Sequence, residues 1–249
     1  MGETPLECLE RYRVENPDYR DVKMTYAGRL DPMAEGELLV LVGEECQNKE
    51  KYLGLDKEYE FDVLFGFSTD TYDILGLVNL GVAPPSFLDY DLPAGRQGLG
   101  EHREKVGEFL KNIKGKQTQK YPAFSSKTID GKPMFELAKA GELEGREIPE
   151  KEIEIYEADF IENYWIKGED LREDIFERIS LVKGDFRQGE ISERWKEVLS
   201  DCREERFLVS KIRIKCSGGT YMRAIVQNLG GFLGIPALAL RIKRVKVFV

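Results

Sequence analysis

The alternation of hydrophobic and polar side chains between Glu58 and Gly66 predicts a β-strand. Every second side chain is aromatic or aliphatic, and the residues between them are mainly acidic. Because successive side chains of a strand point to opposite faces, this pattern predicts one buried face and one wet face. The buried set is Tyr59, Phe61, Val63 and Phe65. The uninterrupted apolar run over residues 38–42 predicts a second strand, buried on both faces.

Other segments predict a mixture of helices and further strands. From Thr220 onward, apolar residues recur at helical spacing and share one face: Met222, Ile225, Val226, Leu229 and Leu233. Residues 5–20 are expected to form a helix followed by a turn at Asn16-Pro17-Asp18. Helices are also expected over residues 101–112, 134–140 and 189–205, and strands around 153–155, 211–216 and 241–248. The Gly- and Pro-rich segment 81–100 predicts a loop. Because no regular βαβ repeat appears, the fold class is expected to be α+β, with a mixed, mainly antiparallel sheet.

Composition limits the domain organisation and the chemistry. A chain of 249 residues suits one substantial domain or two small ones, and 41% hydrophobic residues are enough for a full core. No apolar run approaches the roughly 20 residues that span a bilayer, and the N-terminus lacks the pattern of a signal peptide, so a cytoplasmic location is expected. Four cysteines without a C-x-x-C pair and a single histidine make a metal site unexpected. Chemistry should therefore depend on carboxylates, hydroxyls, lysines and arginines.

The net charge is −9, but the basic residues are concentrated in two segments of the chain. From Arg206 to the C-terminus the sequence has nine Lys/Arg and no Asp/Glu, and from Lys111 to Met134 it has six basic residues and one acidic residue. Local basic surface attracts phosphate even when the whole protein is acidic. Nucleic-acid binding is thus one interpretation of these segments, and an ordinary solvated strand and helix face is the other.

Asp31 and Arg223 are two charged residues that could take part in chemistry, although the pattern alone favours an ordinary turn for Asp31. Asp31 precedes Pro32 in a polar turn, which is a common turn pair as well as a suitable place for a nucleophilic carboxylate. Arg223 lies in the first turn of its predicted helix, where a cation opposes the helix dipole. A carboxylate partner is therefore expected nearby, although a solvent-facing Arg without one is the alternative. Tyr59 is a core residue by default, and a base-stacking residue if it lines a pocket.

Five segments, taken in order along the chain, resemble the TruB family of tRNA pseudouridine synthases. The first is the catalytic-loop segment around Gly28-Arg29-Leu30-Asp31-Pro32. The others are Asp56-Lys57-Glu58-Tyr59, Gly66-Phe67-Ser68-Thr69-Asp70-Thr71, Tyr121-Pro122-Ala123-Phe124-Ser125-Ser126-Lys127 with Gly131-Lys132 and Glu136-Leu137-Ala138 after it, and Cys216-Ser217-Gly218-Gly219-Thr220-Tyr221-Met222-Arg223. Leu240-Arg241 also resembles a Leu-Arg pair near the end of the family's catalytic domain. The resemblance implies a pseudouridine synthase fold and isomerisation of a uridine in the T loop of tRNA.

This resemblance also implies residue roles. Asp31 would be the nucleophile, Arg223 its charge partner, and Tyr59 a residue that stacks on the flipped uracil. The substrate-binding residues would be Tyr26, Arg29, Tyr221, Leu240, Lys127, Lys132 and Arg241. No cofactor or metal is expected. The partner would be the T arm of tRNA, the protein would be monomeric, and no membrane contact is expected.

The sequence also differs from the family pattern. Tyr26 stands where members usually have His, and residues 162–205 form a longer, acidic segment that is expected to be a helical insertion. The chain is expected to be one catalytic domain over residues 1–249, with a loop insertion near 81–100 and no C-terminal PUA domain. Two alternatives remain: a pseudouridine synthase that acts on another RNA, and a non-catalytic tRNA-binding or RNA-folding protein. A small-molecule enzyme is disfavoured because no phosphate loop or cofactor motif is present.

Overall fold

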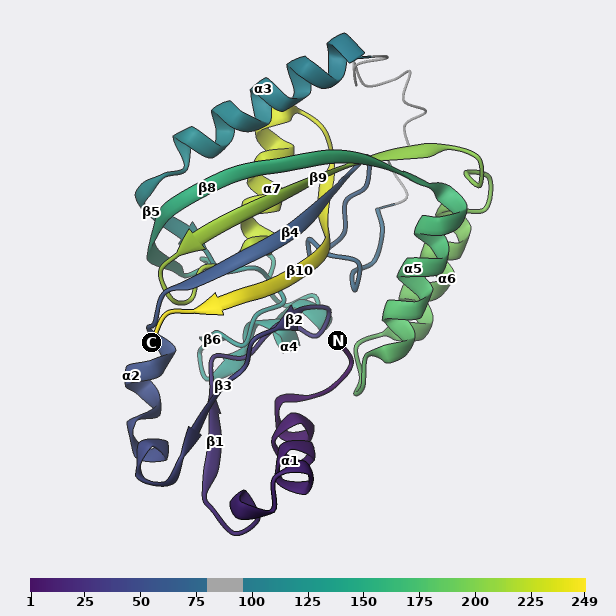
Figure 1. The fold of residues 1–249 in the computed structure, drawn as a ribbon. Coiled ribbons are helices and arrows are strands. Elements are labelled where there is room, and N and C mark those ends of the chain that lie inside the picture. The colour runs from purple at the N-terminus through teal and green to yellow at the C-terminus, as the bar shows by residue number, and fades with distance from the viewer. Residues whose placement is uncertain (80–95) are drawn as a thin grey trace.

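A six-stranded sheet forms the centre of the computed structural model, which describes residues 1–79 and 96–249 (Figure 1). Its strand order is β2-β10-β4-β9-β8-β5. The strands are β2 (Glu35–Gly36), β4 (Lys57–Phe65), β5 (Gly115–Lys120), β8 (Glu150–Lys167), β9 (Arg206–Cys216) and β10 (Ala237–Val247). The β2–β10 pair is parallel and the other pairs are antiparallel. This mixed, mainly antiparallel sheet with flanking helices confirms the α+β prediction.

Strand β4 lies in the middle of the sheet, where its alternating pattern predicted a strand. Phe61 pairs with Ile212 of β9 and with Ile242 of β10. The prediction of one wet face holds only for the first half of the strand, because Asp62 and Leu64 are buried. Helix α5 (Gly168–Leu181) and the end of β8 approach this part of the sheet, and the Tyr164 hydroxyl donates to Asp62 Oδ2 at 2.9 Å.

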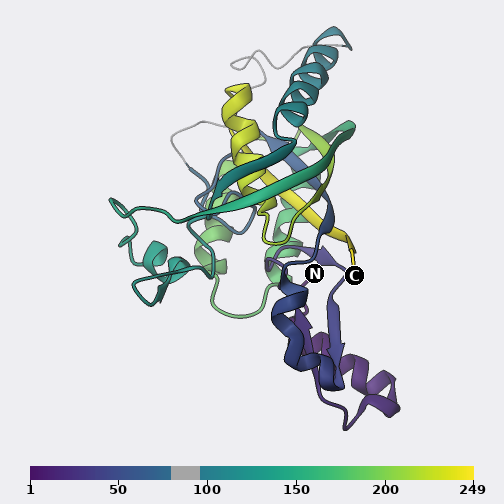
Figure 2. The ribbon, with the colours of Figure 1, turned by 90° about the vertical axis from the view of Figure 1, so that its left-hand side faces the viewer.

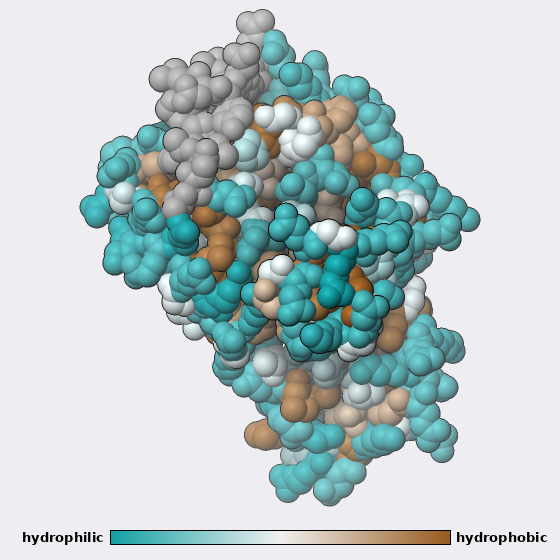
Figure 3. Space-filling view, turned by 180° about the vertical axis from the view of Figure 1, so that it is seen from behind, coloured by the Kyte–Doolittle hydropathy of each residue, from teal (hydrophilic) through white to brown (hydrophobic). Residues whose placement is uncertain are grey.

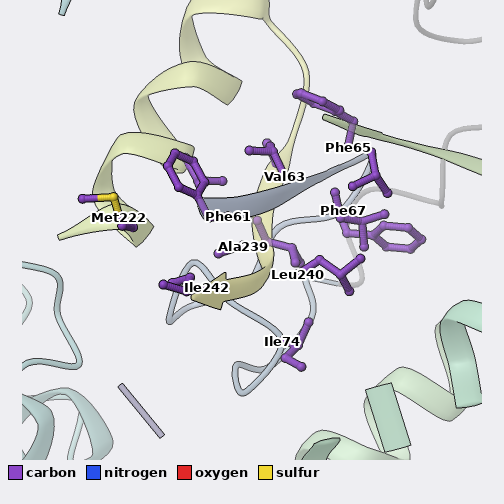
Figure 4. Close-up of a cluster of buried hydrophobic side chains, with 14 of the residues drawn as sticks. Phe61, Val63, Phe65, Phe67, Ile74, Met222, Ala239, Leu240 and Ile242 are labelled. Atoms are coloured by element: carbon purple, nitrogen blue, oxygen red, sulfur yellow. The ribbon is translucent and has the colours of Figure 1, made fainter. Parts of the chain in front are cut away.

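Helices α7 (Met222–Leu233) and α3 (Arg96–Asn112) pack against the sheet, α7 over β10 and α3 over β8. Figure 4 shows part of the core, where side chains from β4 and β10 lie beside Met222 and Ile74. Helix α3 begins at Arg96, so the predicted loop over 81–100 is wrong for its last five residues. The remainder of that predicted loop, residues 81–95, lies outside the described residues.

A small lobe projects from the main body (Figure 2). It contains α1 (Pro5–Glu15), the 3-10 helices Pro17–Tyr19 and Gly43–Asn48, α2 (Lys49–Leu53), and the two-stranded ribbon of β1 (Met24–Ala27) and β3 (Leu39–Val42). Residues 38–42 therefore form a strand, but the prediction that it is buried on both faces is wrong. Leu41 is buried whereas Val42 is 36% exposed, because the ribbon has only two strands and no layer covers its outer side.

The segment 150–205 combines a long strand with two helices. Strand β8 continues through Lys167, so the first residues of the acidic segment 162–205 are strand rather than helix. Helices α5 and α6 (Gln188–Val198) follow and lie side by side at one end of the sheet (Figure 1). Ile191 and Trp195 of α6 are fully buried, so this helix is amphipathic and joins the core.

The remaining elements form an arm beside the cleft described below. They are the hairpin of β6 (Thr128–Ile129) and β7 (Lys132–Pro133), and α4 (Met134–Lys139). On the face of the molecule seen in Figure 3, most of the surface is hydrophilic and hydrophobic side chains occur in small groups. Within the described part of the chain, no helix has the length and apolar character needed to cross a membrane, and no cluster of three or more His, Cys, Asp or Glu side chains could hold a metal ion.

Candidate active site

Asp31 lies in a short loop between β1 and β2 that is fastened to the sheet at both ends. The Ala34 N–H donates to the Asp31 carbonyl at 2.8 Å, so Asp31 does begin a tight turn with Pro32 inside it. Near the end of the loop, Gly36 lies so close to the Arg244 backbone that a Cβ atom would come within 2.1 Å of the Arg244 carbonyl oxygen. Only glycine fits this position.

The buried side chain of Arg244 joins the two ends of this loop. Its Nε donates to the Glu37 carbonyl at 2.7 Å and its Nη1 donates to the Gly28 carbonyl at 3.1 Å. Arg244 is 1% exposed and belongs to the rigid strand β10. The loop therefore has a defined position relative to the sheet, and the carboxylate of Asp31 is held at the surface of a cleft.

Arg223 forms a two-pronged ion pair with Asp31. Its Nε and Nη2 each donate to a different oxygen of Asp31 at 2.8 Å. The guanidinium also donates from Nη1 to the Thr71 carbonyl at 3.0 Å and from Nη2 to the Phe124 carbonyl at 3.3 Å. Arg223 is 4% exposed, whereas the Asp31 side chain is 28% exposed and can be reached from the cleft. The carboxylate partner predicted for this Arg is therefore present.

Asp73 is a second carboxylate beside Arg223, and the sequence analysis did not identify it. Its Oδ2 lies 3.5 Å from Arg223 Nε, and its Oδ1 accepts from the Thr71 hydroxyl at 2.7 Å and from the Leu75 N–H at 2.9 Å. Burial raises the pKa of Asp73 to about 6, although Arg223 favours its ionised form. Burial acts against the charge of Arg223, but the two carboxylates outweigh it and hold its pKa above the ordinary value. No local pattern marks Asp73 as a site residue, because the charge that it faces, Arg223, comes from a segment 150 positions later in the chain.

Two tyrosines line the cleft near this ion pair. Burial raises the pKa of Tyr59 to about 12 and that of Tyr221 to about 12, so both hydroxyls are protonated at neutral pH. Tyr221 precedes α7, and the buried Gln119 fixes its backbone by accepting from its N–H at 2.8 Å and donating to its carbonyl at 3.1 Å. Its ring meets that of Tyr121 edge to face, with centroids 5.6 Å apart.

The cleft around these residues has a volume of about 830 Å³ and a strongly basic lining. Its walls come from the Asp31 loop, β4, the turn after β4, the segment 121–139, the loop between α5 and α6, and the start of α7. The lining holds eight basic side chains, Arg29, Lys57, Lys127, Lys139, Lys151, Arg187, Arg223 and Arg244, against the three carboxylates Asp31, Asp73 and Asp185. The cleft is thus basic in a protein with a net charge of −9.

Comparison with known proteins agrees with this geometry. Residues 17–167 match the family model described as "TruB family pseudouridylate synthase (N terminal domain)". The chain belongs to the TruB family.

Curated relatives support this assignment, and a solved structure shares the fold. The chain is similar to a tRNA pseudouridine synthase B from Caldanaerobacter subterraneus subsp. tengcongensis, with 30% identity over 86% of the chain and 55% of the relative. A tRNA pseudouridine synthase B from Trichormus variabilis is 27% identical over 92% of the chain and 58% of the relative. The chain therefore spans little more than half the length of these relatives. A chain in the "Crystal Structure of a Cbf5-Nop10-Gar1 Complex" has the same fold, with a TM-score of 0.53, 15% identity, and coverage of 99% of this chain and 46% of that chain.

The structure brings some of the residues implied by the TruB resemblance into the cleft. Asp31, Tyr59, Arg223, Tyr221, Arg29 and Lys127 all line it. Arg29 and Lys127 are exposed, and the Lys127 amine lies over the Tyr121 ring, 5.4 Å from its centroid.

Four other residues implied by the resemblance lie outside the set that lines the cleft. Tyr26 is in β1, where the Lys49 amine lies 4.9 Å from its ring centroid. Lys132 is exposed and lies 3.7 Å from Glu142. Arg241 pairs with Asp174 of α5 at 2.7 Å. Leu240 is fully buried at a bulge in β10 (Figure 4).

Proposed function

We propose that this chain isomerises a uridine to pseudouridine in the T loop of tRNA, with Asp31 as the nucleophile. The observation that supports this most strongly is the Asp31–Arg223 pair at the wall of an open, basic cleft. A carboxylate held in two places by a buried guanidinium has a fixed orientation for attack, and a basic cleft attracts a phosphate backbone. Membership of the TruB family agrees with both features.

The isomerisation needs no net gain or loss of electrons. The bond from uracil N1 to ribose C1′ breaks, and a bond from C5 to C1′ forms. C5 loses one proton and N1 gains one. Asp31 would attack the nucleoside, at the base or at C1′, and so free the base to turn within the cleft. The flipped uracil leaves its stack at a cost of a few kcal/mol.

Other residues of the cleft would hold the flipped nucleotide. Tyr59 would stack on the uracil, and its protonated hydroxyl can donate a hydrogen bond because burial raises its pKa to about 12. Tyr221 would line the same space, and Arg29 and Lys127 would contact phosphates at its edge. Leu240 would support the wall of the pocket from within the core. Tyr26, Lys132 and Arg241 would contact parts of the T arm beyond the cleft. The protein would act as a monomer in the cytoplasm.

The direct test is incubation of the protein with an unmodified tRNA transcript and, separately, with ribosomal RNA fragments. Pseudouridine would then be mapped at single-nucleotide resolution. We expect product in the T loop of the tRNA and none in the ribosomal fragments. Product in ribosomal RNA alone would identify a synthase for another RNA. Tight tRNA binding by the folded protein without product would identify a non-catalytic RNA-binding protein.

A further inference from the structure

The loop between α5 and α6, residues 182–187, forms one wall of the cleft. Asp185, Phe186 and Arg187 all belong to the lining, together with residues that are more than 100 positions earlier in the chain. The acidic segment 162–205 therefore contributes to the cleft that contains Asp31 and Arg223. Its acidic residues lie mainly in the two helices, whereas the loop itself holds two basic residues and one carboxylate.

The conformation of this loop is fixed from within by Gln188, the first residue of α6. The side-chain amide of Gln188 donates to the Val182 carbonyl at 3.1 Å and to the Gly184 carbonyl at 2.7 Å. Its Oε1 accepts from the Phe186 N–H at 2.9 Å. Three backbone groups of a surface loop are thus bonded to one side chain, so the loop has a defined shape without a bound partner.

Contacts of Arg187 and Lys139 fix the loop against the cleft. Arg187 Nη1 donates to Asp70 Oδ2 at 2.8 Å, and its guanidinium lies 4.5 Å from the centroid of the Phe124 ring. On the other side, Lys139 of α4 donates to the Asp185 carbonyl at 2.8 Å. Arg187 has φ 62°, a left-handed conformation that is unfavourable for a residue with a side chain and that these contacts maintain.

Arg187 and Arg223 contact neighbouring residues of the same two segments. Arg187 contacts Asp70 and Phe124, and Arg223 donates to the carbonyls of Thr71 and Phe124. The loop is therefore held against the same two segments that hold Arg223. Phe186 is 37% exposed and belongs to the cleft lining, so its aromatic ring is accessible from the cleft.

We propose that the 182–187 loop is an RNA-binding wall, in which Phe186 stacks on an unpaired base beside the target nucleotide and Arg187 is the positioning residue that holds Phe186 in place. This inference rests on the proposed function, because it takes RNA as the ligand of the cleft. An aromatic ring beside basic side chains suits an unpaired nucleotide, whose base can stack while its phosphate lies near Lys127 or Lys139.

The test compares Phe186→Ala with the matched control Phe232→Ala. Phe232 is also an exposed aromatic residue, but it lies on α7 outside the residues that line the cleft. Binding of a fluorescent T-arm hairpin would be measured by anisotropy in an Asp31→Asn background, and KM and kcat would be measured with intact tRNA in the otherwise wild-type protein. We expect Phe186→Ala to weaken binding and raise KM by on the order of tenfold, with kcat little changed. Phe186→Tyr should restore wild-type values, and Phe232→Ala should resemble the wild type.

A double-mutant cycle tests the role of Arg187. If Arg187 acts by placing Phe186, the Arg187→Ala, Phe186→Ala double variant should bind no more than about twofold worse than Arg187→Ala alone. Additive losses would overturn the positioning role of Arg187. Wild-type binding by a folded Phe186→Ala variant would overturn the whole proposal. If Phe186→Ala weakens hairpin binding but the wild-type protein forms no pseudouridine, the proposed activity fails and the RNA-binding wall stands.

Discussion

Two arginines of the basic C-terminal region, Arg213 and Arg223, are only ten positions apart but lie in contrasting environments. Arg213 is 49% exposed on the outer face of the sheet, where its Nε lies 3.0 Å from Glu60 and 3.5 Å from Glu58. Arg223 is 4% exposed and forms its ion pair with Asp31 inside the cleft. Exposed pairs contribute little to stability, whereas removal of one partner from a buried pair is costly. Similar charges in the sequence therefore have different consequences in the fold.

The same contrast applies to the other basic residues of β9. Lys211 lies 3.6 Å from Glu162 and Lys215 lies 3.7 Å from Glu157, both on the neighbouring strand β8. These acidic residues balance the basic charge of the outer face. The cleft differs from this face, because its basic side chains outnumber its carboxylates by eight to three, which leaves positive charge available to a phosphate backbone.

The largest difference between the two regions should follow from the substitution of Arg by Lys in each. Arg223→Lys keeps the charge but cannot form the two-pronged contact with Asp31, so kcat/KM should fall about a hundredfold or more. Arg213→Lys should change kcat/KM less than about twofold. Steady-state kinetics on tRNA measures both variants, and circular dichroism checks that each is folded. Equal effects of the two substitutions would contradict the distinction between the regions.

A smaller effect is expected from the titration of Asp73. With a pKa raised to about 6, Asp73 is ionised above that pH and protonated below it. Loss of this anion beside Arg223 should lower kcat as the pH falls through about 6, by roughly tenfold. Asp73→Asn should already show the lower kcat at pH 8 and a weaker dependence on pH. An unchanged profile in this variant would show that the ionisation of Asp73 does not affect the reaction.

The effect on folding stability has a definite sign. Since the pKa of Asp73 is higher in the folded protein than the ordinary value of 3.8, the folded state binds the proton more tightly than the unfolded state. The contribution of Asp73 to the free energy of unfolding should therefore be most favourable at low pH and decrease as the pH rises from about 4 to above 6. Comparison of urea unfolding between the wild type and Asp73→Asn over this range isolates the contribution.

The smallest expected effect concerns the salt dependence of RNA binding. Lys127→Ala removes one cation from the edge of the cleft, and the slope of log K against log salt should decrease by about 0.7 to 0.9. Lys211→Ala on the outer face should leave that slope unchanged, because Glu162 already neutralises Lys211. Titrations of a T-arm hairpin at several salt concentrations measure both slopes. A decrease of the slope in Lys211→Ala would place RNA on the outer face.

The parts of the fold that depend on local pattern could be predicted from the sequence. The alternation in β4 and the apolar stripe of α7 are both present in the structure. The burial of Asp62 and Leu64 could not be predicted, because the elements that cover them come from segments about 100 residues later in the chain. The run 38–42 was assigned to the wrong environment for a similar reason: an apolar run does not show how many strands lie beside it.

The candidate site could be predicted only in part. The cation in the first turn of α7 indicated a missing carboxylate, and the family resemblance indicated which one. Asp73 and the 182–187 loop gave no comparable signal, because each enters the cleft through contacts across the fold. The basic C-terminal region divides in the structure: Arg223 and Arg244 line the cleft, whereas strand alternation directs Lys211, Arg213 and Lys215 to the outer face.

The central claim is that Asp31 is the nucleophile, and the most direct measurement compares Asp31→Asn with Asp62→Asn on a tRNA transcript. Asp62 is also a carboxylate near an Arg, but it lies in the sheet beside Tyr164 rather than in the cleft lining. Pseudouridine would be mapped after single-turnover incubation, with tRNA binding measured in parallel. The account predicts T-loop pseudouridine from the wild type and from Asp62→Asn, and none from Asp31→Asn despite tRNA binding within a few fold of wild type. Substantial T-loop pseudouridine from Asp31→Asn would contradict it.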